Sequence, residues 1–294
     1  MRSRGPWRQA LSRSRRRPLG MFAVLVVLAF AVVAVLTPRI APYSGAQLFF
    51  QFINDPQPPA LHGGHLLGTD MFGHDTLTQL LWGIRETMLG SLGAALAAML
   101  LGVCLGAPAG YRGGALDAAV GWLTGAVVTV PALGIFVFVV IRYNPVPLWA
   151  FPVTLALALW TYVARAVRAS FASLRAREFV EAARAAGASG PRIVFRHLLP
   201  NSAGLVVVAA TGVLGQSVMI ISTTDFFGLG NEQTDKPTLG GLIANAAKSG
   251  QLPGGQPAPW WLWAIPIVTL GVLLVCANVS ADTLDDILDP ARSR

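Results

Sequence analysis

The sequence predicts an all-α membrane protein with six transmembrane helices and with both termini in the cytoplasm. Hydrophobic residues make up 54% of the 294 positions, whereas charged residues make up only 12%, about half of what soluble domains usually carry. The apolar residues gather in long runs that lack the alternation of barrel strands, and helices are the other structure that satisfies the backbone in lipid. Composition and pattern therefore both place the chain in a membrane.

Six apolar runs are long enough to cross a hydrocarbon core of about 30 Å, which requires roughly 20 helical residues. They cover residues 19–36, 87–109, 118–141, 148–164, 202–223 and 260–281. The first run is longer than the apolar core of a signal peptide, and Thr37-Pro38-Arg39 is a poor cleavage site, so we expect an uncleaved first span. Pro108 and Pro131 fall within spans and predict bends, either passive or able to move.

The basic residues set the orientation of these spans. All but five of the 22 arginines and lysines fall on one side, in residues 1–18, 110–117, 165–201 and 282–294. The exceptions are Arg39, Arg85, Arg142, Lys236 and Lys248. Because basic residues favour the cytoplasmic side, both termini are predicted there, and the net charge of +8 requires no nucleic-acid partner.

The spans divide the chain into four parts. A basic cytoplasmic tail at residues 1–18 precedes the first transmembrane helix at 19–36, an external segment follows at 37–86, and a core extends over 87–290 with a cytoplasmic loop at 165–201. Within the core, Gly102, Gly106 and Gly110 recur at intervals of four, a spacing that lets helix backbones approach closely. We interpret these glycines as general helix packing.

The external segment is predicted to end in a short amphipathic helix that lies flat at the outer interface. Its apolar residues at helical spacing are Leu77, Leu80, Leu81 and Ile84. Asp70 and Asp75 are interpreted as caps of this helix. His62, His65 and His74 are interpreted as surface residues, because no cysteine supports a metal site. Trp149, Trp260, Trp261 and Trp263 are expected at the outer headgroup level.

The six spans contain no ionisable residue at bilayer depth. Ion-coupled carriers usually keep one there despite its cost, so this absence argues against ion coupling. A phosphate-binding loop is also missing, because Lys236 and Lys248 lack its glycine spacing. We therefore expect no cofactor and no catalysis in this chain, and uphill transport would require a separate ATPase that docks on it. A stand-alone channel or secondary carrier is the alternative.

The cytoplasmic loop offers such a dock. Apolar residues recur at helical spacing over 166–184, Gly187 interrupts the helix, Ser189-Gly190-Pro191 restarts it, and Pro200 is placed at the start of a further helix. The result is a helical hairpin with an alanine-rich middle, in which Glu181 can accept hydrogen bonds or pair with an arginine. The competing interpretation is a solvated basic loop that docks nothing.

Glu181-Ala182-Ala183, Gly187, His197 and Leu199-Pro200-Asn201 together resemble the EAA signature of binding-protein-dependent ABC importer permeases. Further segments resemble the C-type subunit of the peptide/nickel group, the DppC and OppC permeases. These segments are Leu66-Leu67-Gly68-Thr69-Asp70, Gly110-Tyr111-Arg112-Gly113-Gly114, Arg175-Ala176-Arg177-Glu178-Phe179-Val180, Phe227-Gly228-Leu229-Gly230 and Leu288-Asp289-Pro290. His74 and Asp225 depart from the pattern, which usually has arginine and an apolar, serine-rich stretch at these places.

The resemblance implies a type I ABC importer permease, in which residues 87–290 are the permease core and 165–201 carry the coupling helix. The implied dock for the ATPase consists of Glu178, Glu181, Ala182, Ala183, Gly187, His197 and Pro200. Implied partners are two nucleotide-binding ATPase subunits or a fused one, which hold the ATP and Mg, a homologous second permease and an extracellular substrate-binding protein. The implied cargo is peptides or similar small solutes, and the implied location is the bacterial cell membrane.

Overall fold

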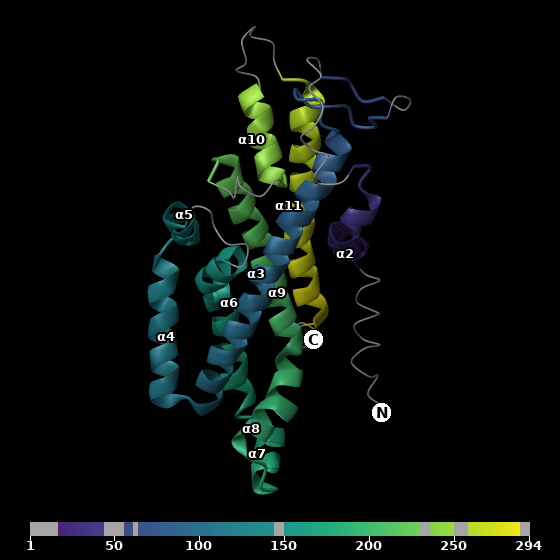
Figure 1. The fold of residues 1–294 in the computed structure, drawn as a ribbon. Helices are drawn as coiled ribbons and strands as arrows, with labels where there is room; N and C mark the ends of the chain where they lie inside the picture. The colour runs from purple at the N-terminus through teal and green to yellow at the C-terminus, as the bar shows by residue number, and fades with distance from the viewer. Residues whose placement is uncertain are drawn as a thin grey trace.

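The structure is a computed structural model that describes residues 17–43, 56–60, 64–143, 150–229, 236–249 and 258–288. These described residues are helical apart from turns, short extended stretches and one isolated antiparallel bridge between Thr69 and Asp75. Figure 1 shows a bundle in which α3, α6, α9 and α11 form the centre and α2 and α4 flank opposite sides. The predicted all-α class is therefore confirmed for the described part of the chain.

The helices follow the predicted apolar runs with shifted ends. Their bounds are α2 Pro18–Ile40, α3 Thr76–Arg112, α4 Gly114–Thr129, α5 Ala132–Arg142, α6 Ala150–Leu174, α7 Glu178–Ala185, α8 Gly190–Ile193, the π-helix η2 Val194–Leu198, α9 Leu199–Phe226, α10 Leu239–Ser249 and α11 Trp260–Leu288. Almost all of the predicted basic tail, residues 1–16, lies outside the described residues, as do Trp149 and His62.

The glycines of α3 make the central seam of the bundle with α6. A Cβ atom on Gly102 would lie 2.5 Å from the Val163 side chain, and one on Gly106 would lie 2.6 Å from the backbone oxygen of Ala164. Gly110 is equally close to the backbone of Arg168. Only glycine allows this approach, so the predicted packing role of the three glycines is confirmed.

Within the described residues, four helices are long and apolar enough to cross a membrane. They are α2, α3, the continuous helix Gly190–Phe226 built from α8, η2 and α9, and α11. The number is five if α4 and α5 count as one bent span. The fourth predicted run lies in α6, which is not among these helices. The number of six spans and the orientation of the termini therefore remain predictions.

The third predicted span is not a single helix. It breaks between α4 and α5, whose axes are bent by 73°. Val130 is extended (φ −88°, ψ 123°), which is the conformation that a following proline imposes, and the ring of Pro131 is incompatible with the helical carbonyl four residues earlier. Pro108, by contrast, lies inside the continuous α3.

The predicted interfacial helix before the second span is also wrong as a separate element. α3 runs unbroken over 37 residues, about 55 Å at 1.5 Å per residue. No proline precedes Pro108 in this helix, so nothing forces a break at the expected boundary near Glu86. Leu80 and Ile84 are buried in the core of the bundle and do not face an interface.

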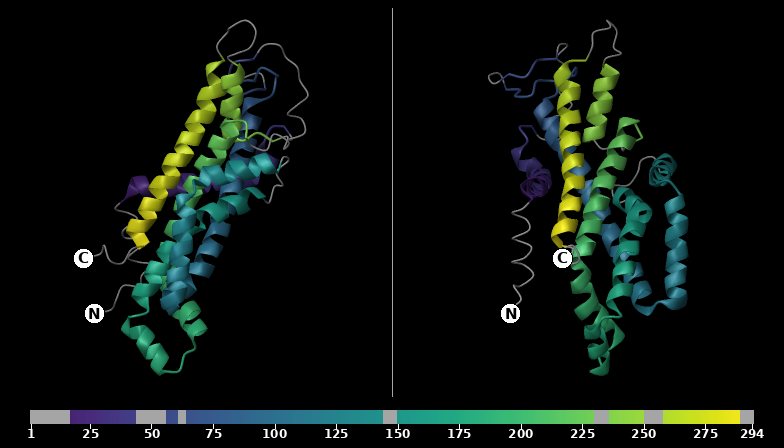
Figure 2. Two further views of the ribbon diagram at one scale, coloured as in Figure 1. Left: turned by 90° about the vertical axis from the view of Figure 1, so that its left-hand side faces the viewer. Right: turned by 180° about the vertical axis from the view of Figure 1, so that it is seen from behind.

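The first helix packs across the bundle. In the left view of Figure 2, α2 lies at a steep angle to α11 and α3. Its C-terminal half is tied to α3, because Arg85 donates to the backbone oxygen of Ala34 (2.6 Å) and Thr37 donates to that of Leu81 (3.2 Å). At its other end Arg17 pairs with Asp286 on α11. The α2 helix therefore belongs to the folded bundle.

Candidate functional site

The hairpin that was predicted to lie in the cytoplasm follows α6 and consists of a turn, α7, α8 and η2. α6 ends at Leu174, Arg175–Arg177 form a turn, and α7 begins at Glu178, so the predicted continuous helix over 166–184 is wrong. The turn is closed by a hydrogen bond from the Arg177 N–H to the Leu174 oxygen (3.1 Å). After this turn, Val180 of α7 is fully buried whereas the neighbouring Phe179 is exposed.

The inner face of the hairpin is continuous with the core of the bundle. Phe171 from α6, Val180 from α7, Ile193 from α8 and Leu198 from η2 are all buried at 0–1% exposure and belong to one hydrophobic cluster. Side chains that are this well buried fix the hairpin to the helices that follow it. The hairpin is therefore a packed part of the bundle.

The turn at Gly187 terminates α7 with a Schellman motif. The Ala188 N–H donates to the Ala183 oxygen (3.0 Å) and the Gly187 N–H donates to the Arg184 oxygen (2.9 Å). Gly187 has φ +77°, in the left-handed region that favours glycine. A Cβ atom at this position would meet nothing within 4 Å, so the backbone conformation alone explains the glycine within this chain.

The outer face of α7 presents the predicted docking residues. Glu178, Glu181 and Ala182 are exposed, and within the described residues neither carboxylate has an ion-pair or side-chain hydrogen-bond partner. Ala183 is partly buried and packs against the core cluster. The first two residues of Glu181-Ala182-Ala183 therefore face outward and the third faces the core.

Pro200 lies in the first turn of α9, as predicted, but the backbone enters α9 from η2 without a break. The helix starts at Gly190-Pro191 and continues through η2, where the Leu199 N–H donates to the Val194 oxygen five residues earlier. Proline has no N–H and its ring collides with the helical carbonyl four residues back, here that of Arg196. The wider π-turn relieves that collision and lets the helix pass through Pro200.

His197 lies in η2, at the base of the hairpin. The half-buried imidazole has no hydrogen bond to any residue that the structure describes. Its backbone oxygen instead accepts from the Asn201 side-chain amide (2.6 Å). The seven predicted docking residues thus lie on one hairpin, but only Glu178, Glu181, Ala182, Gly187 and Pro200 are exposed.

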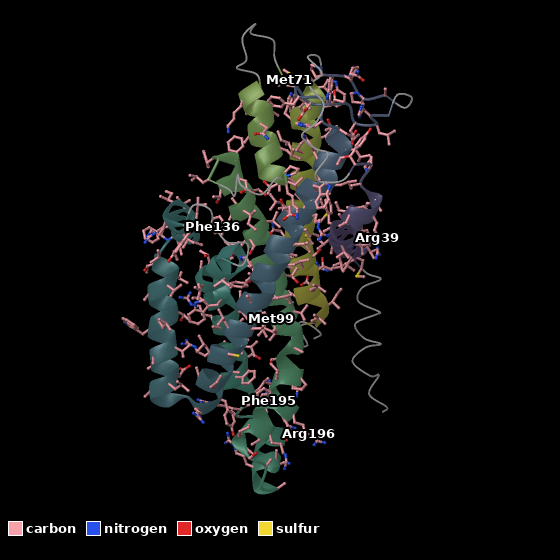
Figure 3. All side chains as sticks on the ribbon, viewed as in Figure 1. Arg39, Met71, Met99, Phe136, Phe195 and Arg196 are labelled. Carbon is pink, nitrogen blue, oxygen red and sulfur yellow. The ribbon has the colours of Figure 1, made fainter. Side chains whose placement is uncertain are left out.

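The external segment lies at the opposite end of the bundle. Figure 3 places Met71 at one end and Phe195 and Arg196 of η2 at the other. Asp75 caps α3 as predicted, accepting from the Thr78 N–H (2.8 Å). Asp70 does not cap α3. Its carboxylate stabilises the turn at residues 70–74 by accepting hydrogen bonds from the backbone N–H groups of Phe72 and His74 (both 2.8 Å).

The external histidines are more buried than predicted. The His65 and His74 side chains are 16% and 12% exposed and pair with Asp75 and Asp70, respectively. Burial opposes ionisation of Asp70, but hydrogen bonds from His74 and Gln79 and the charge of His74 outweigh it and hold the pKa of Asp70 below its ordinary value. Across the described residues no group of three metal ligands occurs.

Two features of this end were missed by sequence reasoning. Trp261 is buried and its indole N–H donates to the Thr69 oxygen (3.1 Å), so its ring faces the protein interior. Asp225, near the end of α9, is buried at 7% exposure, and its Oδ2 has no hydrogen-bond partner among the residues described. Its departure from the family pattern was the only sequence signal for it.

Comparison with known proteins identifies the family. Residues 102–294 match the family described as "Binding-protein-dependent transport system inner membrane component", which is more than half of the chain. The chain belongs to this family. Residues 5–59 of the permease also match the "N-terminal TM domain of oligopeptide transport permease C". The predicted family is therefore confirmed, and the permease is a multi-pass inner-membrane protein.

Relatives of this binding-protein-dependent permease align over nearly its whole length. It is 32% identical over 277 residues to the oligopeptide transport system permease protein OppC of Mycobacterium tuberculosis, covering 94% of this chain and 91% of that protein. It is 30% identical over 285 residues to the dipeptide transport system permease protein DppC of Bacillus subtilis, covering 97% and 86%.

A solved structure supports the fold. A chain of the methionine ABC transporter MetNI in an inward-facing conformation aligns with a TM-score of 0.55 at 20% identity. The alignment covers 72% of the permease and 96% of that chain. At this identity the likeness shows a shared helical fold.

Proposed function

We propose that this permease is the transmembrane subunit of an ATP-driven importer for peptides or similar small solutes, and that it couples ATP hydrolysis in partner subunits to translocation. The observation that carries the proposal is the two-sided hairpin. Its outer face presents the small Ala182 and Glu181, whose carboxylate has no partner among the described residues, while its inner face is packed into the core through Val180. A partner that pushes on such a face moves the core with it, because close-packed interiors transmit strain.

The partners follow from what the chain lacks and from the names of its relatives. Two nucleotide-binding ATPase subunits, or a fused one, would hold ATP and Mg, and this chain would contribute no cofactor. A homologous second permease would complete the pathway, and an extracellular substrate-binding protein would deliver solute to the end of the bundle that carries Asp70 and Trp261. Peptide cargo is supported by the oligopeptide and dipeptide systems to which the relatives belong.

Some of the docking residues would contact the ATPase, and others would maintain the shape of the hairpin. Glu178 and Glu181 would pair with basic groups of the ATPase, and Ala182 would let its surface approach closely. Ala183 and Gly187 would set the shape of the hairpin from within, through the core contact and the Schellman turn. Pro200 and His197 would lie at the base of the hairpin, where the π-turn joins it to α9.

The experiment replaces Glu181 in the assembled transporter. We expect Glu181→Ala to lower ATP-dependent peptide uptake in proteoliposomes by about tenfold or more, because a hydrogen bond to a charged group contributes roughly 1.5–3 kcal/mol. The matched control is Asp282→Ala, which removes an exposed carboxylate of α11 outside the hairpin and should leave uptake unchanged.

The same preparation separates this proposal from a stand-alone channel or secondary carrier. An ATPase subunit that co-purifies with the permease and uptake that requires ATP support the importer. Uptake that continues without ATP or any ATPase, or that is indifferent to Glu181→Ala, rules the proposal out.

A further inference from the structure

The connection between α3 and α4 lies against the coupling hairpin. Figure 1 shows it at the same end of the bundle as α7 and α8. α3 ends at Arg112, and Gly113 and Gly114 reverse the chain with φ of +69° and +61°. Tyr111, in the last turn of α3, is the residue of this connection that reaches both arms of the hairpin.

Three contacts join Tyr111 to the hairpin. The Arg184 guanidinium of α7 lies over the ring, 5.5 Å from its centroid. Gly190 of α8 lies against the ring edge, because a Cβ atom there would be 3.4 Å from Cε1 of Tyr111. Arg175, in the turn before α7, donates from Nη1 to the Tyr111 backbone oxygen (3.4 Å).

Glycines bring the two parts together. A side chain at Gly113 would collide with the Arg175 guanidinium, and a Cβ atom at Gly110 would lie 2.5 Å from the Arg168 oxygen on α6. The backbone of the α3–α4 connection therefore sits directly on the hairpin. The Tyr111 ring also packs against the core cluster that contains Val180 and Ile193.

The ring of Tyr111, and not its hydroxyl, makes these contacts. The hydroxyl has no hydrogen bond within the described parts of the chain, whereas the ring face receives the Arg184 cation. A guanidinium over an aromatic ring is attracted by the negative electrostatic potential of the ring face. Arg184 therefore links the outward-facing α7 to the end of α3.

We propose that Tyr111 is a positioning residue that passes movement of the coupling hairpin to α3, an inference that rests on the proposed ATP-driven function. α3 runs unbroken from Tyr111 to the Asp75 cap at the external end, so it joins both ends of the molecule. The hairpin connects through the covalent chain only to α6 and α9. Through Tyr111, movement of the hairpin would reach α3 as well as α6 and α9.

The test measures solute transported per ATP hydrolysed by the full transporter in proteoliposomes. We expect Tyr111→Ala to lower this ratio about fivefold or more, the usual scale of coupling between sites, while ATPase subunits still co-purify. Tyr111→Phe keeps the ring and should retain the wild-type ratio. Asp117→Asn weakens the ion pair between the first turn of α4 and Arg168 on α6 (3.4 Å) without touching the hairpin, and should also retain the wild-type ratio.

Each outcome decides the inference. A wild-type ratio in Tyr111→Ala overturns it, and so does a loss in Tyr111→Phe as large as that in Tyr111→Ala, because the ring would not be the linking group. Loss of ATPase co-purification in Tyr111→Ala with an unchanged ratio in the remaining complexes assigns Tyr111 a structural role and also overturns it. Wild-type uptake that is independent of ATP rejects the proposed function, and the inference with it.

Discussion

At the scale of single residues, backbone conformation and exposure separate the roles within the hairpin. Glu181 is exposed and unpartnered among the described residues, so its substitution should leave the fold intact. Gly187 is exposed too, yet its φ of +77° makes it a determinant of shape. Glu181 would therefore act through contact with a partner, whereas Gly187 acts through the backbone conformation of the turn.

Gly187→Ala tests the role of the backbone. An L-residue in the left-handed conformation costs roughly 1–2 kcal/mol, and no steric clash adds to this because the Cβ would meet open space. We expect the hairpin turn to loosen, with faster proteolytic cleavage near residue 187 and several-fold lower ATP-dependent uptake. Gly187→Asn is the control, because asparagine tolerates this conformation. Equal losses in both variants would mean that the partner needs the bare glycine surface.

At the scale of helices, the seam between α3 and α6 leaves little room for larger side chains. A Cβ atom on Gly106 would approach the backbone oxygen of Ala164 to 2.6 Å, and a backbone atom cannot swing away as a side chain does. Overpacking of this kind typically costs about 1–3 kcal/mol. The same seam links the helix that bears Tyr111 to the helix that enters the hairpin.

Gly106→Ala should therefore lower the apparent melting temperature of the detergent-purified permease by several degrees, in line with that cost for a chain of this size. Gly125→Ala on α4 is the matched control, since a Cβ atom there meets nothing within 4 Å and alanine favours the helix. An unchanged melting temperature for Gly106→Ala would show that the two helices lie further apart than described.

The helices also show how far sequence reasoning reaches. Long apolar runs predicted the all-helical class, and the glycine spacing predicted close helix packing, because both depend on local pattern. The spacing did not predict that α6 is the helix packed against these glycines. Pro131 and Pro200 behave differently. The chain bends by 73° between α4 and α5 at Pro131, whereas the helix continues from η2 into α9 past Pro200. The choice depends on the packing around each proline, which the sequence does not display.

The same limit explains the errors in the site. The turn at Arg175–Arg177 breaks the helix predicted over 166–184, and on α7 Val180 is buried whereas Phe179 is exposed. The contacts of Tyr111 with Arg175 and Arg184 join residues more than 60 positions apart in the sequence, and no local pattern predicts such contacts. The exposed faces of Glu181 and Ala182, by contrast, follow from their motif and spacing.

At the scale of the whole molecule, the hairpin and the external segment occupy opposite ends of the bundle (Figure 3). The rigid connection between them is α3, roughly 55 Å long, which exceeds a hydrocarbon core of about 30 Å. A helix of that length projects from the membrane. Asp75 caps one end of it, and Tyr111 contacts the hairpin at the other end. The proposed function requires these ends to face opposite compartments.

Cysteine labelling tests that requirement. Phe72 on the external segment and Phe195 on η2 are aromatic side chains exposed by 58% and 69%, so a cysteine at either place should react freely. The background needs Cys104→Ser and Cys276→Ala, which remove the two native thiols. With a membrane-impermeant maleimide we expect Phe72→Cys to be labelled in intact cells and Phe195→Cys only in inverted vesicles. Labelling of both in detergent is the control for reactivity. If Phe195→Cys is labelled in intact cells, the hairpin faces away from the cytoplasm and no cytoplasmic ATPase can drive it.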